Sequence, residues 1–365
     1  MNRRAVLLVI VGSLLLTVSI FAAFGIGLAN ISPRTVLEVF WCKISGSQGS
    51  FNSREEVIVW DVRGARIVLA AIVGAGLSIC GAIMQSLVRN VLADPYLLGT
   101  ASGASAGAAT ILVFGISGVF GLAGAAFIGA VVATVATFAI ASTGGTLTSS
   151  RVILAGITIG FAMTALTNLM VFASGDEGAA RSVMFWMLGS LALASWDQML
   201  LPILALLVTM IVGMGIGSGL DAMSVSDETA QISGFNPQRL RLASMLLVSA
   251  CIAVLVSAAG QIGFVGLVIP HAARRLVGAT NRSVIPVSAL LGATLMVWAD
   301  VIGRIAFQPR EIPLGIITAL VGTPVLIALV RRQYSQGSGP QIKRRLGKEG
   351  NESKNSQTAG CNSDH

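Results

Sequence analysis

The sequence predicts an all-α membrane protein with about ten transmembrane helices, and three observations favour this fold class. Of the 365 residues, 54% are hydrophobic and only 11% are charged, whereas about 25% of residues are charged in an average soluble domain. Apolar runs of about 20 residues recur along the chain, which is the length that a helix needs to cross the hydrocarbon of a bilayer. The 42 glycines are scattered without a repeat, which excludes collagen and favours close packing of helices.

Ten spans are predicted in order along the chain. The first follows Arg3 and Arg4 and is too long for the core of a signal peptide, so we expect a retained helix. Asp94 is predicted to cap the third span, with Pro95 at its first helical position. The segment from Val183 to Ala194 is too short to cross and is predicted to be re-entrant or interfacial. The spans are Ala5 to Ala29, Val62 to Leu87, Pro95 to Phe114, Val119 to Ala141, Val152 to Ala173, Met199 to Gly217, Leu242 to Ala259, Gly263 to Leu276, Val284 to Ile305, and Ile312 to Val330.

The distribution of cations predicts the orientation of the spans. Ten spans leave both termini on one side, and sixteen of the 24 Lys and Arg residues fall on that side. Because Lys and Arg concentrate in cytoplasmic loops, we expect both termini in the cytoplasm. Residues 1–332 are then the membrane domain, and residues 333–365 are a polar tail that we expect to be disordered. Eight cations fall on the outer side: Arg34, Lys43, Arg54, Arg63, Arg66, Arg181, Arg304 and Arg310.

The parity of the spans carries a further implication. Spans two to five and spans seven to ten form two four-helix blocks of opposite orientation, which is typical of inverted-repeat transporters. The two blocks share too little sequence for the residues alone to establish a repeat.

Few residues in the spans have the chemistry that catalysis or metal binding needs. The four cysteines are far apart, which implies no disulfide or metal framework. His271 lies beside Arg274 and Arg275, and since no second histidine lies in a span, a structural role is favoured over an intramembrane enzyme. The sequence contains no Walker-type glycine-lysine motif, so we expect no ATP hydrolysis by this chain and no cofactor or metal bound to it.

Several motifs resemble the FecCD family, the permeases of ABC importers for iron-siderophore, haem and cobalamin. The resemblance covers about residues 5–332 and implies a type II importer permease with inverted repeats. It implies that two permease chains pair around a central pathway and that two cytoplasmic ATPases hold ATP and Mg²⁺. An extracytoplasmic solute-binding protein delivers the metal chelate. The motifs are Gln85 to Gly99 (QSLVRNVLADPYLLG), Gly260 to Arg274 (GQIGFVGLVIPHAAR), Pro286 to Ala293 (PVSALLGA), Asp300, Glu311 to Gly315, and Gly322 to Pro324.

The resemblance assigns the anomalous outer cations to docking of the binding protein. Arg63, Arg66 and Arg304 match positions that contact acidic residues of the binding protein in related permeases. An alternative is that Arg63 and Arg66 snorkel at the interface, while Arg304 pairs with Asp300 or Glu311. The sequence reads Arg-Gly-Ala-Arg from position 63, so the proline that is usual between the two arginines is missing.

The resemblance also implies three sets of residues for transport. The polar segment of about residues 218–241 matches the coupling loop, two short helices that contact the ATPase; a solvated loop is the alternative. The cytoplasmic gate maps to the breaks after spans two and four; the alternative is that these breaks are simply tight turns. The pathway maps to neutral residues of spans five and ten. The coupling residues are Asp227, Glu228, Ala230, Gln231 and Gly234; the gate residues are Asn90, Leu92, Ser149 and Ser150; and the pathway residues are Thr158, Thr164, Asn168, Thr318 and Thr323.

The sequence therefore predicts a homodimeric permease subunit of an ABC importer in a bacterial-type cytoplasmic membrane. Ferric siderophore is the expected substrate, because it is the commonest in the family, and haem or cobalamin are the alternatives. An ion-coupled secondary transporter is a further alternative, but such a protein needs carboxylates or a charge relay at mid-membrane.

Overall fold

A computed structural model describes residues 3–27, 31–46, 51–115, 121–143, 145 and 147–337, and these residues form helices, turns and loops with no strand among them. The chain divides into two units, Met1–Ala319 and Leu320–His365. The predicted all-helical fold class is confirmed for the described residues.

The helices of the first unit follow the predicted spans closely. They are α1 (Arg3–Gly25), α2 (Pro33–Ser45), α3 (Ser53–Glu56), the π-helical η1 (Val57–Gly64), α4 (Ala65–Val88), η2 (Pro95–Leu98), α5 (Thr100–Phe114), α6 (Gly121–Ser142), α7 (Ser149–Ser174), α8 (Glu177–Met187), η3 (Trp196–Gln198), α9 (Leu200–Gly215), α10 (Gly217–Val225), α11 (Asp227–Ile232), α12 (Pro237–Ala259), α13 (Val265–Val277) and α14 (Asn281–Ile305). The last helix, α15 (Leu314–Gly337), begins in the first unit and continues in the second.

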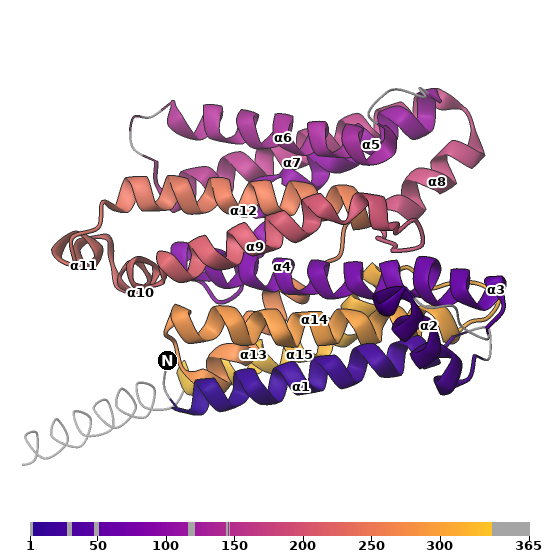
Figure 1. The fold of residues 1–365 in the computed structure, drawn as a ribbon. Helices are drawn as coiled ribbons and strands as arrows, with labels where there is room; N and C mark the ends of the chain where they lie inside the picture. Colours follow the sequence, from indigo (N-terminus) through magenta and orange to yellow (C-terminus); the bar gives the residue numbers. More distant parts are fainter. Residues whose placement is uncertain are drawn as a thin grey trace, which may run out of the picture. The chain divides into compact units, whose positions relative to one another are not determined.

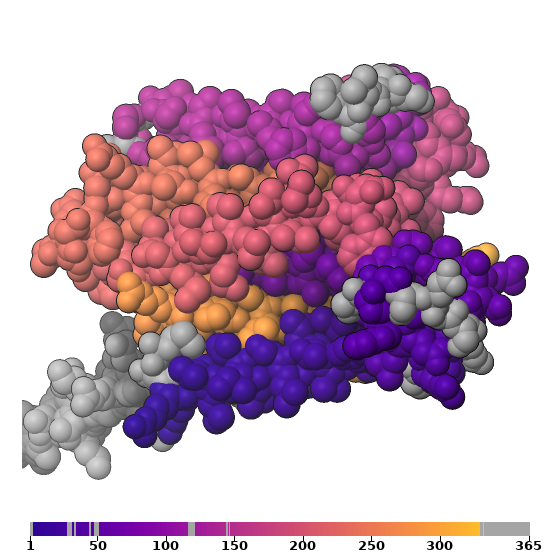
Figure 2. Space-filling view, viewed as in Figure 1, coloured from indigo at the N-terminus to yellow at the C-terminus, as the bar shows by residue number. Residues whose placement is uncertain are grey.

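The lengths of these helices support the prediction of a membrane-spanning protein. Within the described residues, seven helices are long and apolar enough to cross a bilayer, and α5 and the segment Leu314–Ala328 are apolar but shorter. The eighth predicted span, Gly263 to Leu276, corresponds to the short helix α13. Figure 2 shows α9 and α1 on one face of the first unit. Both helices have exposed apolar residues, among them Leu200, Leu207 and Ile211 of α9 and Leu7 and Leu14 of α1. Such an apolar surface suits contact with lipid.

The long helices of the first unit run alongside one another between two ends (Figure 1). At one end lie α10, α11 and the start of α1, and we name it the α11 end; at the other lie α2, α3 and α8, and we name it the α2 end. Helix α4 runs from the α2 end to the α11 end, and α12 runs the opposite way. The first helices of the two predicted four-helix blocks are thus antiparallel.

Helix α4 forms the core of the unit. It packs against α14, α13, α12 and α9, and almost all of its residues are buried. Two of its glycines allow the closest approaches: a Cβ at Gly74 would lie 2.2 Å from the carbonyl oxygen of Gly292, and one at Gly81 would lie 1.7 Å from that of Gly266. Small residues therefore permit helix contacts through backbone atoms.

Two interruptions of helices meet inside the unit. Asp94 is a helix cap, as predicted, but it caps the short 3₁₀-helix η2 and not the third span; its carboxylate accepts from the backbone N of Tyr96 at 2.8 Å. The next helix begins only at Thr100, because Gly99 adopts the left-handed conformation with φ of 75°. The Tyr96 hydroxyl donates to the carbonyl of Ile262, 3.1 Å away, and accepts from the backbone N of Ile262 at 3.2 Å. The irregular backbone is thus buried against protein, as a membrane requires.

The structure differs from the predicted spans in three further places. The polar stretch between the first two spans contains α2, because Ser32 caps it and Pro33 occupies its first position. The second span is continuous with α3 and η1 and begins at Ser53 instead of Val62. The segment predicted from Val183 to Ala194 is the second half of α8 followed by turns, because α8 begins after the Asp176 cap.

Candidate functional site

A charged cluster at the α11 end centres on Arg241, a buried residue near the start of α12. Its Nη2 donates to both carboxylate oxygens of Asp227, the first residue of α11, each 2.9 Å away. Its Nη1 donates to the carbonyl of Leu147 at 3.0 Å, and its Nε donates to Oγ of Ser149 at 3.1 Å. Ser149 is the first residue of α7. One guanidinium therefore joins α11, α12 and the start of α7.

A second arginine also holds Asp227. Arg89, the left-handed residue that ends α4, pairs with the Asp227 carboxylate and donates through Nε to the carbonyl of Met223 at 2.7 Å. Partial burial raises the pKa of Asp227. The hydrogen bonds and charges of Arg241 and Arg89 lower this pKa by more than burial raises it, so that it lies below the ordinary value. Asp227 is therefore ionised at neutral pH and pairs with both arginines.

The other short helix at this end, α10, has a separate attachment. Oδ1 of Asp221 accepts from the backbone N of Asn281 at 2.8 Å and from its Nδ2 at 2.7 Å. Oδ1 of Asn281 accepts from Oγ of Ser86 at 3.0 Å, and Nη2 of Arg274 donates to the same Oγ at 3.1 Å. Helix α10 is thereby fixed to the start of α14 and the end of α4.

The residues predicted for coupling to an ATPase do not share one environment. Glu228, Gln231 and Gly234 are exposed at the α11 end, whereas Ala230 is completely buried. The Asp227 carboxylate faces the two arginines. The pattern that predicts these five residues thus contains both surface positions and positions that hold α11 in place.

The residues predicted for the gate lie near the same cluster. Asn90 is exposed, and its Oδ1 accepts from the backbone N of Leu92 at 2.9 Å, which closes the turn after α4. Ser149 is part of the Arg241 cluster and donates to the carbonyl of Leu87 at 3.1 Å. Ser150 is exposed. The two breaks predicted to form the gate are therefore joined by the Ser149 hydroxyl.

Sequence reasoning missed the residues that connect these elements. From the sequence, Arg89 and Arg241 are predicted only to be two of the sixteen cytoplasmic cations, and no role is predicted for Asn281. A buried arginine in the first turns of an apolar helix is costly unless it is paired. The position of Arg241 at such a helix start was the signal that an acidic partner existed.

A second charged cluster lies at the α2 end, where the three arginines predicted for docking are only 4–7% exposed. Nε of Arg66 lies 2.5 Å from Oδ1 of Asp300, and its two Nη atoms donate to the carboxylate of Glu311 at 2.9 and 2.8 Å. Nε of Arg304 lies 3.0 Å from Oδ2 of Asp300. The pairing of Arg304 with Asp300, the alternative to docking, is thus present in the structure.

The same cluster holds the end of α1. Arg63 donates to the carbonyl of Phe24 at 2.6 Å, and Arg304 donates to the carbonyls of Ala23 and Ile26 at 3.4 and 3.3 Å. The three arginines are therefore brought together by the ends of α1, α4 and α14. Of the acidic residues that they contact, Asp300 is completely buried and the Glu311 side chain is 36% exposed.

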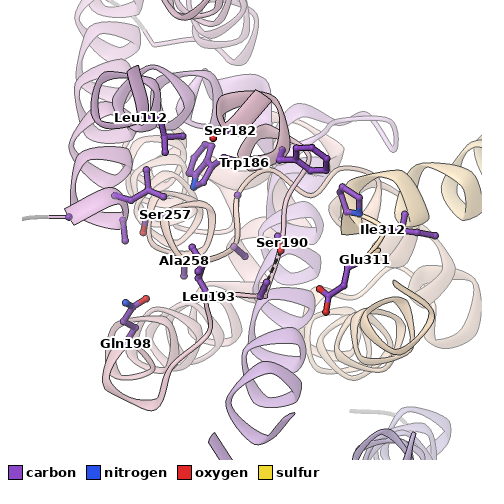
Figure 3. A pocket seen from close by; sticks show the side chains of 18 residues that line it. Leu112, Ser182, Trp186, Ser190, Leu193, Gln198, Ser257, Ala258, Glu311 and Ile312 are labelled. Atoms are coloured by element: carbon purple, nitrogen blue, oxygen red, sulfur yellow. Dashed lines mark hydrogen bonds between the residues drawn. The ribbon is translucent and has the colours of Figure 1, made fainter. Parts of the chain in front are cut away.

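A cavity of about 510 Å³ opens beside Glu311 at the α2 end. Figure 3 shows Trp186 and Ser182 of α8 on one side, Ser257 and Ala258 of α12 on another, and Glu311 facing them. Most of its lining is apolar, with serines and Gln198 as the neutral polar groups. The cavity suits a neutral or partly apolar group more than a bare ion.

The residues predicted to line the pathway are placed differently from one another. Thr158 and Asn168 are exposed on α7, and Thr164 is half-buried there. Thr318 is buried and its Oγ1 donates to the carbonyl of Gly315 at 3.2 Å. Thr323 belongs to the second unit. Helix α7 thus presents a face of neutral and apolar residues away from the rest of the first unit.

His271, the histidine considered for an enzyme, is half-buried on α13. Within the ranges that the structure describes, no three His, Cys, Asp or Glu residues are grouped as a metal site. Cys80 and Cys251 are buried in the core without a disulfide.

Long apolar helices with buried interruptions and ion-paired clusters at both ends are typical of a polytopic membrane protein. The model of the FecCD transport family matches residues 15–332, and the chain belongs to this family.

Known proteins agree with this assignment. The chain is 37% identical over 336 residues to the Fe(3+)-citrate import system permease protein YfmE of Bacillus subtilis, covering 90% of this chain and 96% of the relative. It is 35% identical over 287 residues to the vitamin B12 import system permease protein BtuC of Vibrio cholerae, covering 78% and 86%. A metal-chelate type ABC transporter in an inward-facing conformation has a similar fold, with a TM-score of 0.78 and 29% identity over 89% of this chain and 98% of that one.

Proposed function

We propose that this chain is the permease subunit of an ATP-driven importer that carries a ferric siderophore across a bacterial cytoplasmic membrane. One observation carries the proposal: α10 and α11 lie together at one end and are attached by charged side chains to the ends of α4, α7, α12 and α14. Such an attachment lets force from a partner reach the spans. Two copies of the chain surround the pathway, and both termini face the cytoplasm.

Two ATPase subunits bind at the α11 end in this proposal and hold ATP and Mg²⁺. Glu228, Gln231 and Ile232 are exposed on α11, and the Ile232 side chain is 88% exposed. An exposed apolar side chain among polar ones suits the centre of a protein interface. Ala230 supports the contact from behind, because it packs α11 against the protein.

A solute-binding protein docks at the α2 end in this proposal, through Arg63, Arg66 and Arg304. These side chains are buried and paired, so charge reversal at any of them would test folding together with docking. Glu311 offers a cleaner test, since it is partly exposed and occupies the Nη atoms of Arg66. An acidic residue of the binding protein would compete with Glu311 for Arg66.

Replacing Glu311 by glutamine should therefore strengthen binding of the binding protein, by about tenfold at low salt if one charge-assisted pair is gained. The measurement is surface-plasmon resonance with the transporter in nanodiscs at two salt concentrations. The control is Glu38→Gln, which removes the same charge from the exposed pair with Arg34. Equal affinities of the Glu311 variant and the wild type would contradict docking at Arg66.

The substrate is inferred from the relatives and the cavity. Relatives are named for iron uptake, Fe(3+)-citrate and Fe(3+)-hydroxamate import, and others for haemin, vitamin B12 and molybdate. The neutral, largely apolar lining of the cavity suits a chelate whose organic ligand shields the metal ion. Haem and cobalamin are the alternatives, because they present similar organic surfaces.

Uptake into vesicles tests the proposed function directly. Vesicles that contain the permease, its ATPase and the binding protein should accumulate ⁵⁵Fe-labelled ferric hydroxamate only when ATP is supplied on the ATPase side. Preference for haem or cyanocobalamin would reassign the substrate and retain the importer. Uptake by the permease alone, driven by a proton or sodium gradient, would instead establish a secondary transporter. The position of Asp300 between Arg66 and Arg304 argues against that alternative, because its charge is already balanced.

A further inference from the structure

Arg241 lies between α11 and the start of α7 at the α11 end. Helix α11 packs against α10 and α12, whereas α7 begins on the other side of a cleft of about 690 Å³ that Thr148, Asp227, Gln231 and Arg241 help to line. The Arg241 guanidinium lies in this cleft and reaches both sides, with Asp227 on one and Leu147 and Ser149 on the other. Polar contacts of one side chain therefore bridge α11 and the start of α7.

The hydroxyl of Ser149 extends the connection to α4. Its oxygen accepts from Nε of Arg241 at 3.1 Å, and its hydrogen is donated to the carbonyl of Leu87 at 3.1 Å. The hydroxyl thus uses its donor and an acceptor position at once. Leu87 lies in the last turn of α4, so the chain of contacts runs from Asp227 through Arg241 and Ser149 to the end of α4.

The geometry of these contacts favours joint movement over independent movement. Arg241 presents a planar group whose donors have fixed directions, so a displacement of the Asp227 carboxylate breaks a bond unless the guanidinium follows. The guanidinium cannot follow without displacing Leu147 and Ser149, because all three of its nitrogens are engaged. Since Arg241 is buried, loss of a partner is costly and the pairs are retained.

The hydrogen bonds from Asp221 of α10 to Asn281 do not reach α7, so they do not replace the contacts of Arg241. They join α10 to α14 and to Ser86 of α4. Arg89 also holds Asp227, but it lies at the end of α4 and its Nε donates to Met223 of α10. Among the described residues, Arg241 is therefore the side chain that contacts both α11 and the start of α7 directly.

We propose that Arg241 is a positioning residue that transmits movement of α11 to the start of α7, through Asp227 on one side and Ser149 on the other. The inference rests on the proposed function, because movement of α11 is driven by the ATPase. In this proposal, ATP-driven movement at the α11 end opens the predicted gate at Ser149, and the Arg241 side chain connects the two events. Without this side chain, α11 moves and α7 does not.

Spin labels on both elements test the inference in the assembled transporter. One pair of labels replaces Ser233, the exposed residue that follows α11, and another replaces Leu154 on α7, which is 65% exposed. The distance between the two copies of each label is measured by pulsed EPR with and without ATP, in a background where Cys42 and Cys361 are serine. In the wild type we expect ATP to shift both distances by about 2 to 5 Å, the range of helix shifts in switching proteins.

The Arg241→Gln variant should separate the two shifts. We expect the Ser233 distance to respond to ATP as in the wild type and the Leu154 distance to lose its response. Uptake of ⁵⁵Fe-labelled ferric hydroxamate per ATP hydrolysed should fall about tenfold. The control is Arg239→Gln, which removes the same charge from an exposed position on the same helix and should leave both shifts and the uptake ratio unchanged.

A second variant tests the same contacts in case the first variant misfolds. Ser149→Ala keeps the pair of Arg241 with Asp227 and removes only the hydroxyl that joins Arg241 to Leu87, so it should also reduce the Leu154 shift. Retention of the full Leu154 shift in both variants would overturn the inference. Absence of any ATP-dependent shift in the wild-type complex would overturn the proposed function, and the role of Arg241 with it.

Discussion

Replacing Asp300 by alanine should destabilise the protein by about 3 to 5 kcal/mol, because it leaves two buried arginines without their shared partner. Asp300 is completely buried, and Arg66 and Arg304 beside it are 7% and 6% exposed. Bulk water has little access to solvate the two guanidinium groups at these positions. The melting temperature of the detergent-solubilised protein, followed by tryptophan fluorescence, measures the effect.

The neighbouring carboxylate provides the comparison for this prediction. Glu311 contacts the same Arg66 but is 36% exposed, so Glu311→Ala should cost only about 0 to 1 kcal/mol. A loss for Asp300→Ala no larger than that for Glu311→Ala would contradict the view that burial of the cluster controls its energy. Asp300→Asn should lie between them, because the amide oxygen keeps a hydrogen bond while the negative charge is lost.

The spans were predictable because one constraint dominates their sequence. Backbone polar groups must be paired inside lipid, so each crossing segment is an apolar helix of sufficient length. The helix cap at Asp94 was predictable for a similarly local reason, since its carboxylate and Pro95 act on the adjacent backbone. Interactions within a few residues of one another leave a pattern that can be recognised in a single sequence.

Interactions between distant residues left no such pattern. Arg66 and Asp300 are separated by 234 positions, and Arg241 and Ser149 by 92. The predicted topology placed Arg66 on the outer side, but the choice between an external partner and Asp300 depended on how α4 and α14 pack. Resemblance to a family placed Asp227 and Ser149 in separate functional groups, and only the fold joined them through one arginine.

Short elements at the ends of the bundle were also difficult to predict. Helix α2 is short and amphipathic, and it contains charged residues. Its mean hydropathy is therefore too low for a span, and the sequence predicted a polar stretch there. The π-helical turn from Val57 to Gly64 continues into α4 although it contains Asp61 and Arg63. Here packing, including the stacking of Trp60 on Trp196 with ring centres 5.3 Å apart, outweighs local composition.

Replacing Gly81 by alanine should prevent the normal packing of α4 on α13 and cost about 3 kcal/mol or more. The added Cβ would lie 1.7 Å from the carbonyl oxygen of Gly266 and 2.5 Å from its carbonyl carbon. Both atoms belong to the backbone, so no rotamer change relieves the overlap and the two helices must move apart. Alanine favours a helix by about 1 kcal/mol over glycine, so the clash must exceed this gain for the variant to be destabilised.

Gly215 on α9 is the matched control, because a Cβ there would have no heavy atom within 4 Å. We expect Gly215→Ala to change stability by less than about 1 kcal/mol. Monodisperse elution and the melting temperature of both variants provide the measurement, and equal behaviour would show that α4 and α13 are further apart than described. Separation of these helices would also disturb η2, since Pro95 lies against Gly266. The close contact at Gly81 therefore supports the buried interruption of the helices at η2.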